Sequence, residues 1–235
     1  MLRAIDSKAM GRGMHGWLDS HFHFSFSEYY NPENIDFGVL RVLNDDIVLP
    51  GTGFENHPHQ NMEIVSYVLE GELTHGDNMG NEQTISRGHA QYMSAGTGVW
   101  HSEMNNGTLP LRFFQIWIFA DKDGYEPNYG DHRFAWEDRI NVWMPMATSI
   151  NNATNTAPIK MHQDINMYAS YLSAGKSLPF TVSVGRQAYL ALAEGKIRVN
   201  GIGLHERDAL EIVEEDIVID ALEDAHIVVI EMPKA

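Results

Sequence analysis

Residues 57–75 read HPHQNMEIVSYVLEGELTH, and this stretch sets the pattern that the rest of the chain repeats. Ile64 to Leu69 is a short run of β-branched, aromatic and aliphatic residues, which is typical of a buried strand. The Glu70-Gly71 pair that follows predicts a turn, and Glu72 to His75 predicts the next strand. The stretch therefore favours an all-β fold.

Strand-like runs of this kind extend through most of the chain and are separated by Gly, Asn and Asp turns. The Asn106-Gly107 pair lies between two of them and predicts a hairpin turn. From Ala120 to about Pro158 the pattern weakens, and the stretch from Asn151 to Pro158 predicts an exposed connection. Further strands are expected over residues 21–26, 38–43, 90–93, 100–104, 111–119, 168–172, 180–184, 188–192, 196–199, 209–213, 217–219 and 227–231.

The two halves of the chain resemble each other around a shared Glu-Gly pair. Residues 67–73 read YVLEGEL, and residues 191–197 read ALAEGKI. This similarity predicts two related β-sandwiches or barrels. Carrying His57 and His59 over on the same alignment leads to Thr181 and Ser183, which are poor ligands for a transition metal. The second half is therefore expected to keep the scaffold without the chemistry of the first.

Composition narrows the classes of protein to consider. The 235 residues include 32 acidic and 16 basic side chains, which give a formal net charge of −16. Because phosphate binding needs clustered cations, direct nucleic-acid binding and binding to an anionic membrane surface are disfavoured. The absence of cysteine excludes disulfides, thiolate metal sites and cysteine nucleophiles. With no apolar leader at Met1 to Asp6 and no run of about 18 apolar residues, we expect a cytoplasmic protein.

Two short clusters carry the candidate chemistry, His57-Pro58-His59 and His101-Ser102-Glu103. Each cluster has two potential metal ligands at positions i and i+2, which lie on one face of a β-strand. Two facing strands could thus offer three imidazoles and one carboxylate to a single divalent ion. Such a set leaves coordination positions open for a substrate, as catalytic sites do. Pro58 removes a backbone donor, so its strand is expected at a sheet edge or at a bulge.

Other residues near the two clusters have more than one interpretation. His21 and His23 share the i, i+2 spacing but lack an acidic follower, and we interpret them as a solvent-facing or structural pair. Glu63 follows His59 at an even spacing, on the same expected strand face. It is a candidate ligand, a group that orients a histidine, a general base, or a solvated strand residue. Three apolar residues are candidate pocket walls or ordinary core residues: Phe54, Met93 and Trp100.

These motifs resemble those of the cupins, and more closely those of the pirins. The first cupin motif corresponds to Gly51, the His57/His59 pair and Glu63, whereas Ser94 stands where the second motif has a proline. The resemblance to pirins covers nearly the whole chain. It is carried by HGWLDS at 15–20, FSF at 24–26, HPH at 57–59, ME at 62–63, YVLEG at 67–71, MSAGTG at 93–98 and HSE at 101–103.

The resemblance to pirins implies a ligand set and an architecture. In that family the ligands are three histidines and the glutamate of the second motif, which correspond here to His57, His59, His101 and Glu103. Glu63 would then lie outside the ligand set. The implied fold is all-β, with two stacked cupin domains that are each a jelly-roll β-barrel. A metal-binding domain is expected over residues 1–140 and a cupin-like domain without metal ligands over residues 141–235. The resemblance also favours a monomer.

The resemblance further implies an activity. Bacterial pirins of this length resemble quercetin 2,3-dioxygenases, which open a flavonol ring with dioxygen and release a depside and carbon monoxide. The expected partners are therefore a flat aromatic flavonol and O₂. A metal ion can acidify the flavonol 3-hydroxyl, and we expect Glu103 to accept its proton, with Glu63 as the second candidate. Iron is the expected metal, with nickel, copper, manganese, cobalt and zinc as alternatives.

Three other functions remain open. Eukaryotic pirins resemble transcriptional cofactors, so the chain is alternatively a metal- or redox-sensitive regulator that binds a protein partner without turnover. The acidic surface suits such a partner better than DNA. A different cupin reaction, such as another ring-opening dioxygenase or a sugar isomerase, is the second alternative. The third is a regulator of a metabolic enzyme in which the metal only stabilises the fold.

Overall fold

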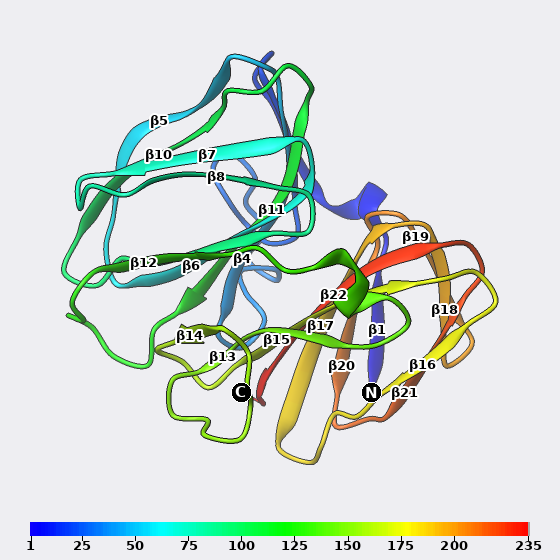
Figure 1. Ribbon diagram of the computed structural model, residues 1–235. Helices are drawn as coiled ribbons and strands as arrows, with labels where there is room; N and C mark the ends of the chain where they lie inside the picture. The colour runs from blue at the N-terminus through cyan, green and yellow to red at the C-terminus, as the bar shows by residue number, and fades with distance from the viewer. Residues whose placement is uncertain (235) are drawn as a thin grey trace. The chain divides into compact units, whose positions relative to one another are not determined.

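The computed structural model describes residues 1–234 and shows a chain built almost entirely of β-strands that pair antiparallel (Figure 1). Short 3₁₀ turns occur at Ser7–Ala9 and Trp136–Arg139. Within the described residues there is no helix with the length and apolar character needed to cross a membrane. The all-β prediction is confirmed.

The strands form two compact units, and their bounds differ in three places from the predicted 1–140 and 141–235. The N-terminal unit contains Gly11–Phe134 together with residues 161–163. The C-terminal unit contains the rest of the described chain, including Met1–Met10. The first residues join it because the opening strand pairs along its length with the strand at Ala209–Val213.

Two sheets make up the N-terminal unit, and Figure 1 shows them as two layers. The larger sheet runs in the order β12 (Asn128–His132), β9 (Ala90–Ser94), β6 (Met62–Glu70), β11 (Leu111–Phe119), β4 (Leu40–Val48), β3 (Leu18–Phe22) and β2 (Gly11–Met14). The smaller sheet runs in the order β5 (Thr52–His59), β10 (Val99–Asn105), β7 (Glu72–Asp77) and β8 (Glu82–Ser86). Apolar side chains of both sheets meet in one cluster, where Val68 and Phe113 pack with Leu73 and Ile85.

The C-terminal unit repeats this plan. Its larger sheet runs in the order β1 (Leu2–Ile5), β20 (Ala209–Val213), β17 (Arg186–Glu194), β22 (Ala225–Pro233), β15 (Asn166–Leu172), β13 (Met144–Ser149) and β14 (Ile159–Met161). Its smaller sheet runs in the order β16 (Ser177–Phe180), β21 (Ile217–Ala221), β18 (Lys196–Val199) and β19 (Ile202–His205). Its interior is apolar: Leu190 and Val229 of the larger sheet pack with Ile197 and Ile219 of the smaller one.

The repeated Glu-Gly pair has the same structural role in both units. Gly71 carries the chain from β6 to β7, and Gly195 carries it from β17 to β18, each time from the larger sheet to the smaller one. Both glycines have left-handed backbone conformations, with φ of 76° and 86°. A Cβ atom on Gly71 would lie 2.5 Å from the carbonyl oxygen of Pro110, and one on Gly195 would lie 2.0 Å from that of Asp224. At both positions glycine is therefore required for two reasons: the left-handed backbone conformation, and the lack of space for a Cβ atom.

Replacing Gly71 with alanine is expected to lower the free energy of unfolding by more than the about 1–2 kcal/mol that a left-handed backbone alone costs. The additional loss comes from the contact with the Pro110 carbonyl, which is backbone and cannot rotate away. Gly80→Ala is the matched control, because Gly80 has φ of 93° but open space around its Cβ position. Urea denaturation of the three proteins measures both losses; equal losses for the two variants would contradict the argument.

The predicted hairpin at Asn106-Gly107 is wrong. β10 belongs to the smaller sheet and β11 to the larger one, so the segment between them crosses from one sheet to the other. The Asn105 side chain stabilises this crossing: its amide group donates to the Val48 and Leu109 carbonyls, and its carbonyl accepts from the Gly107 N–H. A dipeptide that favours tight turns thus serves a longer connection.

Candidate metal centre

Two neighbouring strands of the smaller sheet carry the histidines. His57 and His59 lie near the end of β5, and His101 on β10 is directly opposite His57 in the strand register. β5 is the edge strand of this sheet. Pro58, which has no N–H to donate, is thus found where a proline is tolerated, and the expectation of an edge strand is confirmed.

A β-bulge in β5 sets the direction of the first pair. His101 is opposite His57, but Glu103 is opposite Phe54, so β5 has one residue more than β10 over this stretch. The extra residue allows Phe54 and His57 to face the same side despite their odd spacing. It also leaves the carbonyl of Glu55 in the bulge, where it lies 2.7 Å from Nδ1 of His57. A proton on Nδ1 donates to this carbonyl, which leaves the Nε2 lone pair available to a metal.

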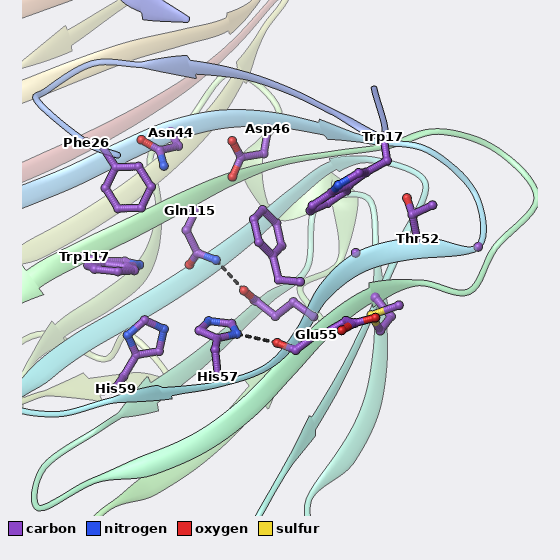
Figure 2. Close-up of a pocket in the computed structure, with 15 residues that line it drawn as sticks. Trp17, Phe26, Asn44, Asp46, Thr52, Glu55, His57, His59, Gln115 and Trp117 are labelled. Atoms are coloured by element: carbon purple, nitrogen blue, oxygen red, sulfur yellow. Dashed lines mark hydrogen bonds between the residues drawn. The ribbon is translucent and has the colours of Figure 1, made fainter. Parts of the chain in front are cut away.

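The three imidazoles form a nearly equilateral group. Their ring centroids are 4.6 Å apart for His57 and His101, 4.8 Å for His57 and His59, and 4.9 Å for His59 and His101. One ligand nitrogen from each ring lies within 4.8 Å of the other two. In Figure 2, His57 and His59 point from β5 into a cavity. The sequence prediction that these three residues come together agrees with this placement.

The chemistry of this group fits a divalent transition metal. Among residues 1–234, neither ring nitrogen of His101 has a hydrogen-bond partner, although the side chain is buried. Burial and the neighbouring His57 and His75 lower the pKa of His101 to about 3. Burial and the other two imidazoles lower the pKa of His59 to about 4. Neutral imidazoles with unused lone pairs are the form that binds metal, and three of them suit Fe, Ni, Cu or Zn.

Glu103 faces the same cavity but lies outside the group of close ligand nitrogens. Its buried carboxylate accepts hydrogen bonds from Ser66 Oγ at 2.5 Å, from Gln91 Nε2 at 2.7 Å, and from Gln115 Nε2. These donors come from three strands of the larger sheet, so they hold the Glu103 carboxylate of the smaller sheet in one orientation. Its predicted role as the fourth ligand stays a prediction.

A cavity of about 740 Å³ opens beside the histidines. This volume lies in the range of small-molecule sites. Four aromatic side chains form much of its wall: Trp17, Phe26, Phe54 and Trp117. They contact each other edge to face, with ring centroids 5.3 Å apart for Trp17 and Phe54 and 5.4 Å apart for Phe26 and Trp117. Such a wall suits a flat, apolar ring system.

Known proteins share both the sequence and the domain pattern of this chain. The Pirin family profile matches residues 5–118, and the profile of a quercetinase C-terminal cupin domain matches residues 148–232. A pirin-like protein of Caulobacter vibrioides is 40% identical over 223 residues, which cover 94% of this chain and 95% of the relative. The chain belongs to the pirin family. A protein named quercetin 2,3-dioxygenase in Escherichia coli K12 is 37% identical to this pirin over 226 residues, 95% of each chain.

Solved structures agree with the family. The crystal structure of YhhW from Escherichia coli matches this pirin with a TM-score of 0.93 and 34% identity, covering 100% of this chain and 99% of that chain. A structure of the bacterial pirin YhhW in complex with nickel(II) matches with a TM-score of 0.92 and the same identity, covering 100% of both chains. The predicted bicupin fold is thus confirmed.

Glu63 of this pirin does not share a strand face with His59, contrary to the expectation from spacing. The chain turns at Asn61, which has a left-handed φ of 52°, and Glu63 lies on β6 in the other sheet. Its buried carboxylate accepts hydrogen bonds from Tyr92 Oη, Ser94 Oγ and the His162 N–H. It is not part of the cavity wall. A catalytic role for Glu63 stays a prediction, and these contacts favour a structural one.

The three predicted pocket walls have different positions in this pirin. Phe54 lines the cavity. Met93 is buried in a small apolar cluster with Ile64 and Val99. Trp100 points outward from β10 and is 48% exposed. Alternation along β10 explains the last result, because Trp100 and the inward-facing His101 are adjacent.

Sequence reasoning missed the polar side chains that the larger sheet contributes to the cavity. These are Asn44 and Asp46 on β4 and Gln115 on β11. Asn44 and Gln115 are directly opposite each other in the strand register. Residues 43–48 read LNDDIV, and the three polar residues in a row hide the strand alternation that would place Asn44 and Asp46 on one face.

Proposed function

We propose that this pirin is a metal-dependent dioxygenase that opens the ring of a flavonol, with quercetin as the model substrate. The observation that carries the proposal is the convergence of His57, His59 and His101, two of which, His57 and His59, line a cavity of about 740 Å³ with aromatic walls. The name of the Escherichia coli relative, quercetin 2,3-dioxygenase, supports the same activity.

The three imidazoles and the Glu103 carboxylate are the groups that would hold the ion. When bound there, a divalent ion would supply Lewis acidity that lowers the pKa of the flavonol 3-hydroxyl. Iron is our proposed metal, because imidazole and carboxylate ligands suit it. Nickel is a direct alternative, since the Escherichia coli pirin was crystallised with nickel(II).

Glu103 is the proposed acceptor of the hydroxyl proton. Ser66, Gln91 and Gln115 hold its carboxylate toward the cavity, so no rearrangement is needed to bring it to the substrate. A carboxylate already fixed by three donors is also prevented from rotating away from the histidines.

The aromatic wall is proposed to bind and orient the flavonol. Trp17 and Phe54 on one side, and Phe26 and Trp117 on another, present ring edges and faces to the cavity. Trp117 also contacts His59 edge to face, with ring centroids 4.7 Å apart. A flat substrate between these side chains would displace water from the space next to the histidines, where water would compete for the reacting positions.

Oxygen uptake on a panel of flavonols tests the proposal. Protein loaded separately with iron and with nickel is expected to consume one O₂ and release one CO for each flavonol opened, so that the depside accounts for the remaining atoms. An oxygen electrode and a CO-binding haem assay measure the two gases. Absence of uptake with both metals and every flavonol of the panel would contradict the proposed activity.

A metal-sensitive regulator that binds a protein partner is the second candidate. Trp100, 48% exposed, is opposite Pro58 in the strand register and lines, together with His59, a smaller hollow where β5 ends and β10 begins. Exposed tryptophans are frequent anchors of protein interfaces. This function predicts a partner that binds only the metal-loaded protein and is lost in Trp100→Ala, whereas the dioxygenase function predicts unchanged turnover in that variant.

A further inference from the structure

A polar pair lies on the side of the cavity opposite the histidines. Asn44 and Asp46 are at positions i and i+2 of β4, so both face the interior from the larger sheet. They are only 3% and 2% exposed. Figure 2 shows them in a row with Phe26 and Trp17, across the cavity from His57 and His59.

The amide of Asn44 is not satisfied by the protein. Its Oδ1 atom is buried and accepts no hydrogen bond from any described residue of the chain. The opposite residue, Gln115, directs its Nε2 to Glu103 and makes no hydrogen bond to Asn44 Oδ1. A buried amide oxygen without a donor costs free energy that an apolar residue would avoid. The fold alone therefore gives no reason for an asparagine at this position.

Asp46 adds a second polar group beside Asn44. Its carboxyl accepts a hydrogen bond from Ser20 Oγ. Burial, and to a smaller extent the charges of Asp45 and Glu103, raise the pKa of Asp46 to about 8. Near neutral pH a carboxyl of this kind retains its proton and can donate as well as accept. Asn44 and Asp46 together thus match a hydroxyl group, which also both donates and accepts.

We propose that Asn44 and Asp46 bind a phenolic hydroxyl at the end of the substrate remote from the histidines, and so select polyhydroxylated flavonols over those with unsubstituted outer rings. The inference rests on the proposed function and names the residues that determine its substrate class. The aromatic wall between the two ends accepts any flat ring system, so hydrogen bonding at the remote end supplies the discrimination. A site built to bond a hydroxyl rejects the analogue that lacks it, because its own polar groups are then left unpaired.

Ligand affinity of the metal-loaded protein under anaerobic conditions tests the proposal. Quercetin, which has hydroxyls on its outer rings, is compared with 3-hydroxyflavone, which has none. Quenching of tryptophan fluorescence reports binding, since Trp17 and Trp117 line the cavity. Wild-type protein is expected to bind quercetin more tightly. Asn44→Leu, which is similar in size, is expected to weaken quercetin binding about ten- to hundredfold and to leave 3-hydroxyflavone binding unchanged.

Two controls separate recognition from a structural role. Asn44→Leu is expected to unfold at the same temperature as wild type or higher, because it removes an unsatisfied buried group. Asp46→Asn keeps a donor and an acceptor in the same place and is expected to retain the preference for quercetin. An Asn44→Leu protein that is destabilised, or that loses affinity for both ligands equally, overturns the proposal.

The outcome is distinguishable from that of the dioxygenase test. If the protein discriminates between the two ligands in the way described but consumes no oxygen, the proposed function fails and the recognition site stands. If both flavonols are opened with equal kcat/KM, and Asn44→Leu changes neither value, the recognition site fails and the proposed function stands. No binding of either ligand overturns both.

Discussion

Replacing His101 with glutamine is expected to abolish stable metal binding. His101 is buried beside the other two imidazoles, and its ring nitrogens have no hydrogen-bond partner among the described residues. Removing a group that is hydrogen-bonded to a metal ligand typically lowers metal affinity by about 10- to 100-fold. Removing a ligand itself is expected to lower the affinity further. Metal content per chain after gel filtration measures the loss, and thermal unfolding with added metal reports it independently. At a metal concentration a thousandfold above Kd, wild type should gain about 4 kcal/mol of stability.

Two further variants make this result interpretable. His57→Gln changes a half-buried ligand on the edge strand, with less risk to the core, and is expected to show the same loss of metal. His132→Gln changes an exposed histidine on β12 of the same unit and is expected to keep both the metal and the metal-dependent stabilisation. Retention of one metal ion per chain in both His57→Gln and His101→Gln would refute the site.

Exchange of Glu103 for glutamine is expected to reduce flavonol turnover by about 10²- to 10⁴-fold, the usual contribution of a general base. Glutamine keeps the size of the side chain but cannot accept a proton, and its amide nitrogen would face donors such as Gln91 and Gln115. Oxygen uptake should be normalised to the metal content of each sample, because Glu103 is also a predicted ligand. The two roles are then separated: loss of turnover per bound metal reports the base.

Glu63→Gln is the matched control for Glu103→Gln. Glu63 is equally buried, but it bonds Tyr92, Ser94 and the His162 backbone, away from the cavity wall. We expect it to lower thermal stability while turnover per folded, metal-loaded protein remains unchanged. If turnover falls in Glu63→Gln and not in Glu103→Gln, the assignment of the base is wrong and the second candidate from the sequence takes its place.

The strands that carry the candidate ligands could be predicted because the features that identify them lie within a few neighbouring residues. Alternation along β10 places His101 and Glu103 on one face, and the proline between His57 and His59 indicates an edge strand. The Glu-Gly pairs revealed the repeated unit for a similar reason: a left-handed turn against a backbone carbonyl admits only glycine, and that requirement is visible in the sequence.

The parts that sequence reasoning missed depend on contacts between distant segments. Asn44 and Gln115 belong to different strands, and only their pairing across the larger sheet reveals that both face the histidines. The position of Glu63 depended on a reversal at Asn61 that even spacing does not reveal. Similarly, a hairpin and a crossing between sheets both use an Asn-Gly pair, so the dipeptide at 106–107 could not distinguish them.

The extra residue in β5 has a genetic consequence. It frees the Glu55 carbonyl to accept from Nδ1 of His57, so the length of the strand, and not only the identity of its histidines, determines which ring nitrogen faces the metal site. In-frame loss of the codon for Asn56 would return the strand to regular pairing and leave His57 without this acceptor. Metal affinity would then change by about 10- to 100-fold with every ligand still encoded. Related genes can thus diverge in metal affinity through small insertions and deletions alone.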